Sequence, residues 1–461
     1  MEKSNRILIS NALAVFTGEK NNLRLSGMDI YIEGPEIKLV GKNLSRKIKR
    51  PDRKIEARNC VVIPGLVNTH HHLYQTFTRA IPAVANAKLF DWLVYLYEVW
   101  ANLTPEMVYT SALVGLGELL LTGCTTSADQ FYVFPEGQPT NLIDSEIAAA
   151  KKLGIRFHPT HGSMSLGRSR GGLPPDRVVQ NEEKILQESE RLFTKFHNPE
   201  KFSMCRLSLA PCSPFSVTKE LLKLSAEFAR QKQIYLHTHL AETLDEEKFC
   251  LEKMGKRPFE YMEEVGWTGR DVWYAHCVYL NDEEIKKMAR TKTGVAHCPV
   301  SNLRLGSGIA PVRKMLNEGV NVSLAVDGSA SNDSSNMLAE LRQCLLIHRI
   351  KSGVDSMSVD EVLLMATVGG ATVLGRNDIG KIAPGYAADI AIYDLNKIGY
   401  AGASDPIEAL LLCGSSQIAR TVLVNGKVVV DNYRLKNIDE NNLIKTANRL
   451  SRKLPTGGKK C

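Results

Sequence analysis

Residue types that bind metals follow several β-like runs of this chain. The motifs are Asn68-Thr69-His70-His71-His72, His237-Thr238-His239, Tyr274-Ala275-His276 and Val326-Asp327-Gly328. Side chains two positions apart on a strand share a face, so His70 and His72 should point the same way. Three imidazoles and one carboxylate make a mixed nitrogen and oxygen donor set, which suits a divalent transition ion with an open position for water. The pattern predicts metal-dependent hydrolysis.

Strand-like and helix-like segments alternate through the middle of the chain. Eight candidate strands occur at 61–68, 123–129, 154–161, 203–210, 233–239, 271–277, 293–298 and 321–327. Segments with helical periodicity, such as Pro105 to Leu121 and Val217 to Gln231, fill the gaps. This alternation predicts an α/β fold, a (β/α)8 TIM barrel. The candidate ligands then fall at the carboxyl ends of the first, fifth, sixth and eighth strands, the face on which barrel active sites are built.

Both ends of the chain are rich in short strands and turns. The last of these strand-like runs flank Asn425-Gly426, a strong signal for a two-residue hairpin. Neither end carries enough apolar sequence to fold alone. We therefore expect residues 1–64 and 378–461 to form one composite β-sandwich domain, and residues 65–377 to form the catalytic barrel.

Composition excludes several classes of partner. The 461 residues are 44% hydrophobic with a formal charge of +8, and the densest basic patch, 44–54, is typical of a solvated loop and not of a nucleic-acid surface. Ten cysteines without a Cys-x-x-Cys pair indicate a reducing compartment. No signal peptide or membrane-spanning run is evident. We expect a cytoplasmic protein that acts on a small molecule, with no nucleic-acid polymer and no membrane as partner.

These motifs resemble those of the amidohydrolase superfamily, and in particular its mononuclear branch, which deaminates nucleobases and related heterocycles. The resemblance is carried by Pro64 to His72, His239 with Glu242, His276, residues 326–333 and residues 380–389. A narrower resemblance to 8-oxoguanine deaminases is carried by 72–79, 162–167, 210–215 and 240–247. Two positions depart from the family pattern, since His161 stands in place of arginine and Cys277-Val278 in place of Gly-Ile.

The resemblance implies one divalent metal ion, Zn²⁺ or alternatively Fe²⁺. Its ligands would be His70, His72, His239 and Asp327. The binuclear branch of the superfamily has a bridging lysine at the end of the fourth strand, where this chain reads Leu209-Ala210-Pro211-Cys212. The absence of that lysine favours one metal.

The resemblance also implies roles for catalytic residues. The metal lowers the pKa of its bound water, and His276 would orient that water. Glu242 would carry a proton from water to the ring as general acid and base, and Asp327 would pass a second proton to the leaving amine. Candidate substrate contacts are Gln75, His161 and Cys212.

The reaction implied is deamination of 8-oxoguanine to urate and ammonia. Isoxanthopterin, guanine or a triazine are alternative substrates, and hydrolysis of a cyclic amide is an alternative reaction class. Family membership also implies a homo-oligomer.

Several residues allow an interpretation other than a direct role in catalysis. By strand alternation His71 faces away from His70 and His72, which indicates a structural role. Glu242 is either the proton shuttle or an ordinary acid at a helix start. The aromatic segment 89–100 is either a lid over a flat substrate, a packing helix or a subunit interface. His297 either supports the centre or belongs to the core.

Overall fold

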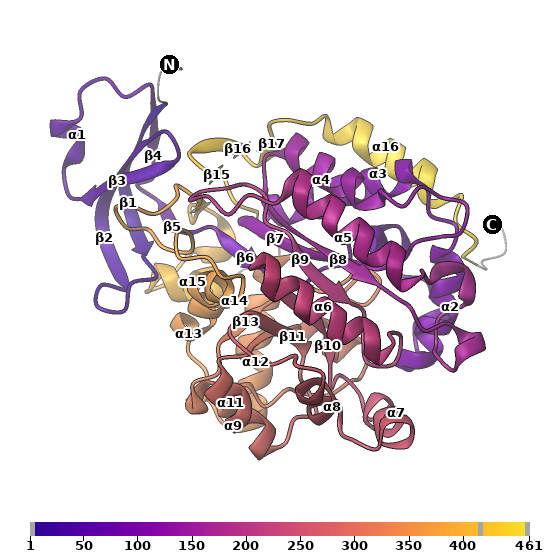
Figure 1. Ribbon diagram of the computed structural model, residues 1–461. Coiled ribbons are helices and arrows are strands. Elements are labelled where there is room, and N and C mark those ends of the chain that lie inside the picture. Colours follow the sequence, from indigo (N-terminus) through magenta and orange to yellow (C-terminus); the bar gives the residue numbers. More distant parts are fainter. Residues whose placement is uncertain (1–4, 414–417, 457–461) are drawn as a thin grey trace.

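The computed structural model describes residues 5–413 and 418–456, and in these residues an eight-stranded barrel stands beside a nine-stranded sheet (Figure 1). The barrel strands are all parallel and follow one another in chain order. They are β6 (Leu66–Asn68), β7 (Cys124–Phe131), β8 (Arg156–Ser163), β9 (Ser208–Pro211), β10 (Tyr235–Leu240), β11 (Val272–His276), β12 (Gly294–His297) and β13 (Val322–Leu324).

The first and last barrel strands meet at their carboxyl ends. The Thr69 amide donates to Leu324 O at 3.4 Å, and the Asp327 amide donates to His70 O at 3.2 Å. The side chain of Asn68 accepts from the Val326 amide at 2.9 Å. These bonds close the barrel and bring the first and last candidate ligand motifs together, although 257 positions separate His70 from Asp327.

Helices cover the outside of the barrel, as the alternating pattern predicts. The segment Pro105–Leu121 is helical over the predicted bounds, with Pro105 at its first position and Thr104 accepting from the Met107 amide as its N-cap. The longer helices are α2 (Leu89–Trp100), α3 (Pro105–Leu121), α4 (Leu142–Leu153), α5 (Glu182–Phe196), α6 (Lys219–Lys232), α7 (Leu244–Met254), α9 (Asp282–Thr291), α12 (Met337–Ser352) and α16 (Glu440–Ser451). Shorter ones include α8 (Pro258–Glu264), α10 (Pro299–Arg304), α11 (Val312–Glu318), α13 (Val359–Leu364), α14 (Gly370–Val373) and α15 (Pro406–Leu412).

Strands from both ends of the chain build the second sheet. Its order is β17-β16-β15-β14-β5-β1-β2-β3, with β4 paired to β1. The central antiparallel pair of β5 and β14 joins the N-terminal strands to the C-terminal ones. The strands are β1 (Arg6–Phe16), β2 (Arg24–Glu33), β3 (Glu36–Gly41), β4 (Arg53–Glu56), β5 (Cys60–Pro64), β14 (Ile390–Asp394), β15 (Thr421–Val424), β16 (Lys427–Asp431) and β17 (Arg434–Leu435). The predicted fold class is confirmed, and the hairpin at Asn425-Gly426 lies where it was predicted.

The predicted first barrel strand, 61–68, is two strands. Residues up to Pro64 pair within the nine-stranded sheet, whereas residues from Leu66 pair with β7 of the barrel. Gly65 lies at the change of sheet, where a Cβ atom would come within 2.0 Å of Thr125 Oγ1. Because any side chain would collide there, glycine is required at this junction. The hydrophobic run alone did not reveal the break.

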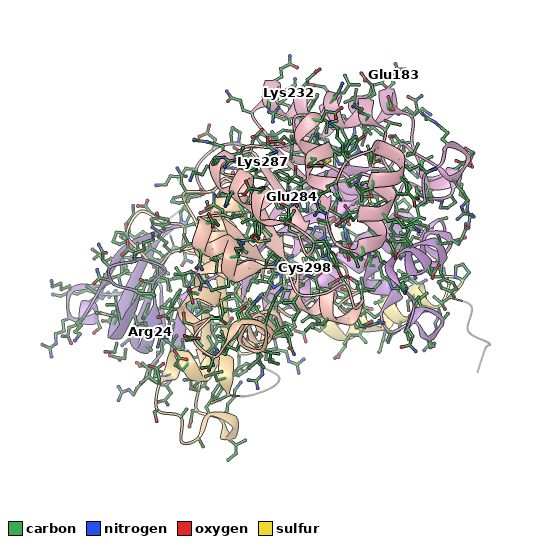
Figure 2. The ribbon with its side chains drawn as sticks, turned by 90° about the horizontal axis from the view of Figure 1, so that it is seen from below. Arg24, Glu183, Lys232, Glu284, Lys287 and Cys298 are labelled. Carbon is green, nitrogen blue, oxygen red and sulfur yellow. The ribbon has the colours of Figure 1, made fainter. Side chains whose placement is uncertain are left out.

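Ion pairs fix the barrel to the sheet. Arg156 of β8 is fully buried and its guanidinium contacts the carboxylate of Asp389 at 2.9 Å. At another edge, Arg24 of β2 reaches Asp360, Asp405 and Glu408 at 2.7, 3.3 and 2.6 Å (Figure 2). In Figure 1 the C-terminal helix α16, in yellow, runs along α3. Across the described ranges, no helix has both the length and the apolar character needed to cross a bilayer.

Candidate metal centre and active site

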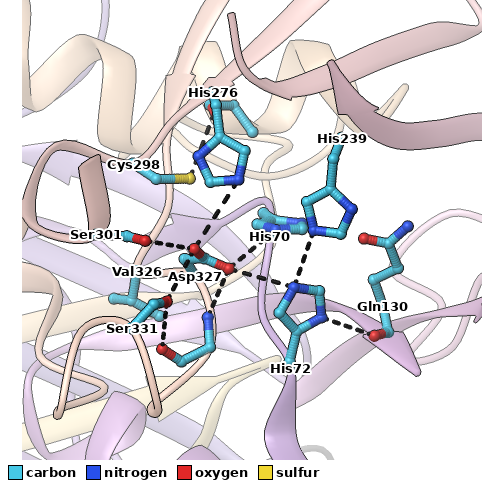
Figure 3. A network of polar contacts seen from close by, with 12 residues as sticks. His70, His72, Gln130, His239, His276, Cys298, Ser301, Val326, Asp327 and Ser331 are labelled. Atoms are coloured by element: carbon cyan, nitrogen blue, oxygen red, sulfur yellow. Dashed lines mark hydrogen bonds and ion pairs between the residues drawn. The ribbon is translucent and has the colours of Figure 1, made fainter. Parts of the chain in front are cut away.

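Four buried imidazoles meet around Asp327 at the carboxyl end of the barrel (Figure 3). Each ring is held through its Nδ1 atom. Nδ1 of His72 donates to Gln130 O at 2.8 Å, and Nδ1 of His239 donates to Cys212 O at 2.6 Å. Nδ1 of His276 lies 2.9 Å from Asn302 Oδ1. Nδ1 of His70 lies 2.7 Å from Nε2 of His237. Each ring therefore turns its Nε2 atom inward, as metal-ligating histidines do when the other nitrogen is anchored.

The carboxylate of Asp327 lies among these rings. Its Oδ1 is 3.1 Å from His70 Nε2 and 3.3 Å from His72 Nε2, while Oδ2 is 3.9 Å from His276 Nε2. Oδ2 also accepts from the hydroxyls of Ser301 and Ser331 at 2.6 and 3.0 Å. These contacts fix the orientation of both carboxylate oxygens, because rotation of the Asp327 side chain would break the bonds to the two serines.

The donor set fits a divalent ion. One donor atom from each of His70, His239, His276 and Asp327 can be chosen so that all four lie within 4.8 Å of one another. Nε2 of His72 joins them, 3.0 Å from His239 Nε2. Within the described residues Nε2 of His70 is buried and makes no well-aligned hydrogen bond, although Asp327 Oδ1 lies 3.1 Å away. Burial lowers the pKa of His70 and of His239 well below the usual value, which keeps these rings in the neutral, ligating form. The group has the nitrogen and oxygen chemistry predicted, and the choice of His70, His72, His239 and Asp327 as ligands stays a prediction.

Two members of this group have a strained backbone. His276 and Asp327 both have positive φ, at 72° and 63°. Residues other than glycine rarely adopt a positive φ, and those that do cluster at functional sites. The conformation directs both side chains back over the barrel axis. Gly328 follows Asp327, and a Cβ atom there would stand 1.9 Å from Gln75 Oε1, so glycine is required for the amide of Gln75 to approach.

Glu242 lies at the edge of the metal centre. Its Oε2 is 3.6 Å from His276 Nε2, and Ser307 Oγ donates to its Oε1 at 3.5 Å. Helix α7 begins only at Leu244 with Thr243 as its cap, so Glu242 is not an acid of the first turn. Burial raises the pKa of Glu242, while the nearby His276 opposes that shift. A carboxyl group with a raised pKa, facing a cavity, can both take up and release a proton.

Glu246 supports Glu242 through the backbone. Its two carboxylate oxygens accept from the amides of Ala241 and Glu242 at 3.0 and 2.8 Å. Ala241 has a positive φ of 50°, so the turn after β10 is strained and needs this support. This role of Glu246 was not predictable from the sequence, because it depends on the exact course of that turn.

His237 is a second residue that sequence reasoning missed. It lies on β10 two positions before His239, so the strand period places both rings on the barrel interior. Its Nε2 contacts His70, and its Nδ1 donates to Trp273 O at 2.9 Å. The ring also stacks on Trp273, with 4.4 Å between centroids. The His-Thr-His spacing was the available signal, since it repeats the spacing of His70 and His72.

A small cavity opens onto the metal centre. Its polar lining comes from the centre itself together with Gln75, Tyr97, Tyr132 and Ser331. Its apolar wall comes from Leu89, Trp92, Leu93, Phe215 and Leu305. Small-molecule sites have this character, with an apolar enclosure and few polar groups.

Helix α2 supplies much of the cavity wall. Leu89, Trp92, Leu93 and Tyr97 all line the cavity, so the aromatic segment 89–100 covers it in the manner of the lid interpretation. Trp92 Nε1 and Tyr97 OH are buried without a hydrogen-bond partner in the described part of the chain. Unpaired buried donors are costly, which indicates that they face a ligand.

Two of the three predicted substrate contacts line the cavity. They are Gln75 and Cys212, and burial raises the pKa of the Cys212 thiol to about 12, so it stays protonated. His161 is not part of the lining, and its Nδ1 lies 2.7 Å from Ser189 Oγ on α5. This ring faces the helix layer, so a substrate contact through His161 stays a prediction without structural support. His71 bonds Ser335 at 2.9 Å and faces away from the centre, as strand alternation predicts.

A family model supports this assignment of the fold and centre. The model of the amidohydrolase family matches residues 61–429, which spans the barrel and part of the second sheet. The chain belongs to the amidohydrolase family. The prediction of an enzyme, a hydrolase that acts on C–N bonds, is confirmed.

Known proteins of this kind match over nearly the whole chain. An 8-oxoguanine deaminase of Pseudomonas aeruginosa is 46% identical over 426 residues, which cover 92% of this chain and 94% of that protein. An isoxanthopterin deaminase of an unknown prokaryotic organism is 35% identical, with 97% of each chain covered. Among solved structures, an atrazine chlorohydrolase from Arthrobacter aurescens TC1 in complex with zinc superposes with a TM-score of 0.92 at 37% identity, covering 96% of this chain and 100% of that one.

Proposed function

We propose that this amidohydrolase deaminates 8-oxoguanine, with water, to urate and ammonia. The observation that carries the hydrolytic deamination is the placement of the buried Glu242 carboxyl, in the lining of the cavity and 3.6 Å from an imidazole of the metal centre. The 46% identity to an 8-oxoguanine deaminase supports the choice of substrate.

A divalent ion, Zn²⁺ or Fe²⁺, would be held by His70, His72, His239 and Asp327. When bound, it supplies a water acidic enough to ionise near neutral pH. Zinc in the related chlorohydrolase structure supports Zn²⁺, although the same ligands suit iron.

Glu242 is the proton carrier in this proposal. Its Oε2 takes a proton from the attacking water and delivers it to the ring nitrogen beside the aminated carbon. The carbon–oxygen bond then forms as the ring nitrogen becomes neutral N–H. The raised pKa of Glu242 suits both halves of the transfer, because the best general acid and base has a pKa near the working pH.

Asp327 and His276 complete the proton transfers. Oδ2 of Asp327, held by Ser301 and Ser331, receives the second water proton and releases it to the amine, so that the carbon–nitrogen bond breaks and neutral ammonia leaves. Burial alone would lower the pKa of His276. The carboxylates of Glu242 and Asp327 raise it by a larger amount, so the pKa of His276 lies above its usual value. His276 therefore orients the attacking oxygen as a hydrogen-bond donor from Nε2.

The cavity favours a purine with an extra oxygen. Among residues 5–413 and 418–456 nothing accepts from Trp92 Nε1 or Tyr97 OH, and a buried donor of this kind needs an acceptor from the ligand. 8-Oxoguanine offers O8 as acceptor and N7–H as donor, whereas guanine offers N7 as acceptor and nothing at C8. Guanine would leave one of these buried donors unpaired, and such mismatches reduce kcat/KM by roughly 10⁴-fold in sites built for the hydrogen bond.

Steady-state kinetics of ammonia release tests this proposal. The panel is 8-oxoguanine, guanine, isoxanthopterin, cytosine and an aminated triazine. We expect the highest kcat/KM with 8-oxoguanine and urate as its product. A preference for isoxanthopterin or guanine would reject the substrate and leave the deaminase reaction standing. Hydrolysis of a cyclic amide without ammonia release would reject the reaction class.

The setting proposed for this activity is cytoplasmic and homo-oligomeric. A reducing compartment suits the ten cysteines of the sequence, none of which forms a Cys-x-x-Cys pair. Light scattering after size exclusion measures the assembly, and a monomer at working concentration would contradict that part of the proposal.

A further inference from the structure

Three buried metal-binding side chains gather at a second place, outside the active-site cavity. His297 ends β12, and Cys344 and His348 lie one turn apart on α12. Residues four apart share one face of a helix, so the thiol and the imidazole of α12 both turn towards the strand. One donor atom from each residue lies within 4.8 Å of the other two, and all three side chains are buried.

Hydrogen bonding within the protein leaves this cluster incompletely satisfied. Nε2 of His297 lies 3.0 Å from Nε2 of His348, so the two rings share a single bond. Nδ1 of His297 is buried and has no partner in the described part of the chain. Buried polar atoms are almost always paired, so this Nδ1 indicates a missing water, while the two Nε2 atoms that face each other are the nitrogens available to an ion. Burial also lowers the pKa of His348 to about 4, so both rings stay neutral at physiological pH.

We propose that His297, Cys344 and His348 hold a second, structural divalent ion, with Zn²⁺ as the best match. Thiolate and imidazole are the usual ligands of zinc, with bonds of about 2.3 Å to sulfur and about 2.0–2.1 Å to nitrogen. Tetrahedral angles then place two ligating nitrogens about 3.3 Å apart, close to the 3.0 Å between the rings. Small side-chain rotations bring the sulfur into range, and a water fills the fourth position. Binding releases the thiol proton, because coordinated thiols are deprotonated.

The place of this cluster gives the ion a function. Directly after His297 comes α10, whose Ser301 and Asn302 bond Asp327 and His276. On α12, Glu340 lies one turn before Cys344 and accepts from the Val300 amide at 3.2 Å. An ion bound here joins α12 to the end of β12. It therefore holds in place the segment that orients two residues of the active site.

Sulfur distinguishes this site from the catalytic centre, whose predicted ligands are nitrogen and oxygen. X-ray absorption at the zinc edge of the zinc-loaded full chain should show a sulfur scatterer at about 2.3 Å. The sulfur should vanish in Cys344→Ala and persist in Cys212→Ala, the matched variant near the catalytic centre. Cobalt substitution gives a second measure, since a sulfur-to-cobalt absorption band should follow the same pattern.

Metal content completes the test. We expect two zinc ions per chain in the wild type. Cys344→Ala and His70→Ala should each hold one. Cys60→Ala, which removes a buried cysteine of the second sheet, is the control and should hold two. Cys344→Ala should keep deaminase activity within about threefold at low temperature and lose it at a lower temperature than wild type. Zinc without sulfur ligation in the loaded wild type overturns the proposal and identifies the cluster as a hydrogen-bonded histidine pair. Sulfur that disappears in Cys212→Ala and remains in Cys344→Ala overturns it as well.

Discussion

Nε2 of His237 lies 2.7 Å from Nδ1 of His70, across the barrel from one strand to another. The contact determines which nitrogen of His70 can face a metal, because a ring whose Nδ1 is bonded offers Nε2. His237 is itself anchored to Trp273 O. Trp273, His237 and His70 thus form a series of contacts inside the barrel, and this series orients the ring of His70 in the metal centre.

Replacement of His237 tests this chain of contacts. His237→Phe keeps a ring that can stack on Trp273 but removes the bond to His70. We expect zinc affinity at the catalytic centre to fall about 10- to 100-fold, as for other outer ligand-orienting groups. Competition with a chelator measures that affinity. An unchanged affinity in a folded variant would show that His70 needs no orienting partner.

Replacement of Glu242 separates proton transfer from metal binding. Glu242→Gln keeps the shape and the hydrogen bond to Ser307 but cannot carry a proton, so kcat should fall about 10²- to 10⁴-fold with the metal retained. His70→Ala should instead lose metal at the catalytic centre together with activity. Glu252→Gln, an exposed acid on α7, serves as control. Turnover by Glu242→Gln at near the wild-type rate would falsify the proton-shuttle role.

Trp92 should distinguish 8-oxoguanine from guanine. Trp92→Phe keeps an aromatic wall and removes the Nε1 donor, whose loss should cost about 1–2 kcal/mol, or roughly 10-fold, in binding the oxygen at C8. The kcat/KM for 8-oxoguanine should therefore fall while that for guanine stays nearly constant. Tyr95→Phe, on the same helix but bonded to Thr456 O, is the matched control. An equal loss for both purines would mean that Trp92 only shapes the cavity.

A buried pair of carboxyl groups should make stability depend on pH. Burial raises the pKa of Asp129 to about 6, and burial together with Asp129 raises that of Glu146 well above its usual value. Between pH 4 and pH 6 the folded state therefore binds more protons than the unfolded one, and the free energy of unfolding falls as pH rises. The stabilising contribution is fully present below the unfolded pKa and is lost as pH rises through the folded pKa.

Removal of Glu146 isolates this effect. Glu146→Gln can donate a hydrogen bond to Asp129 and needs no shared proton, so it should be more stable than wild type at pH 8, by on the order of 2 kcal/mol. At pH 5 the two proteins should differ little. Urea unfolding at both pH values gives the comparison. A constant difference across this range would show that the pair does not share a proton.

Truncation tests the composite domain proposed for 1–64 and 378–461. Removal of residues after 380 deprives β5 of its partner β14, to which it pairs from Cys60 to Pro64. Strands without partners are marginally stable in water. Proteases should then cleave within the first 60 residues at least tenfold faster than in the full chain. Equal cleavage rates would show that the N-terminal strands fold independently.

The features that were predictable from the sequence depend on local patterns. The alternation of strand-like and helix-like segments predicts the barrel. Metal-binding residue types at the ends of these strands identify His70, His72, His239, His276 and Asp327 as candidates, because parallel strands bring their carboxyl ends to one face. The contact of His237 with His70 was not predictable, since it depends on the spacing of β6 and β10 across the interior. The position of His161 was missed because the side of β8 on which each residue lies depends on pairing with both neighbouring strands.

Only Gly65 separates β5 from β6, so the position of each residue near the catalytic centre depends on the exact length of this junction. His70 follows β6 by two positions, and alternation along this stretch sends His70 and His72 inward and His71 outward. One inserted residue after Gly65 would turn His70 and His72 outward and His71 inward. Of the three histidines, only His71 would then reach the metal. We therefore expect an insertion at this junction to destroy the metal centre. Changes in α2, which lines the cavity, can alter the shape of the substrate site and leave this junction unchanged.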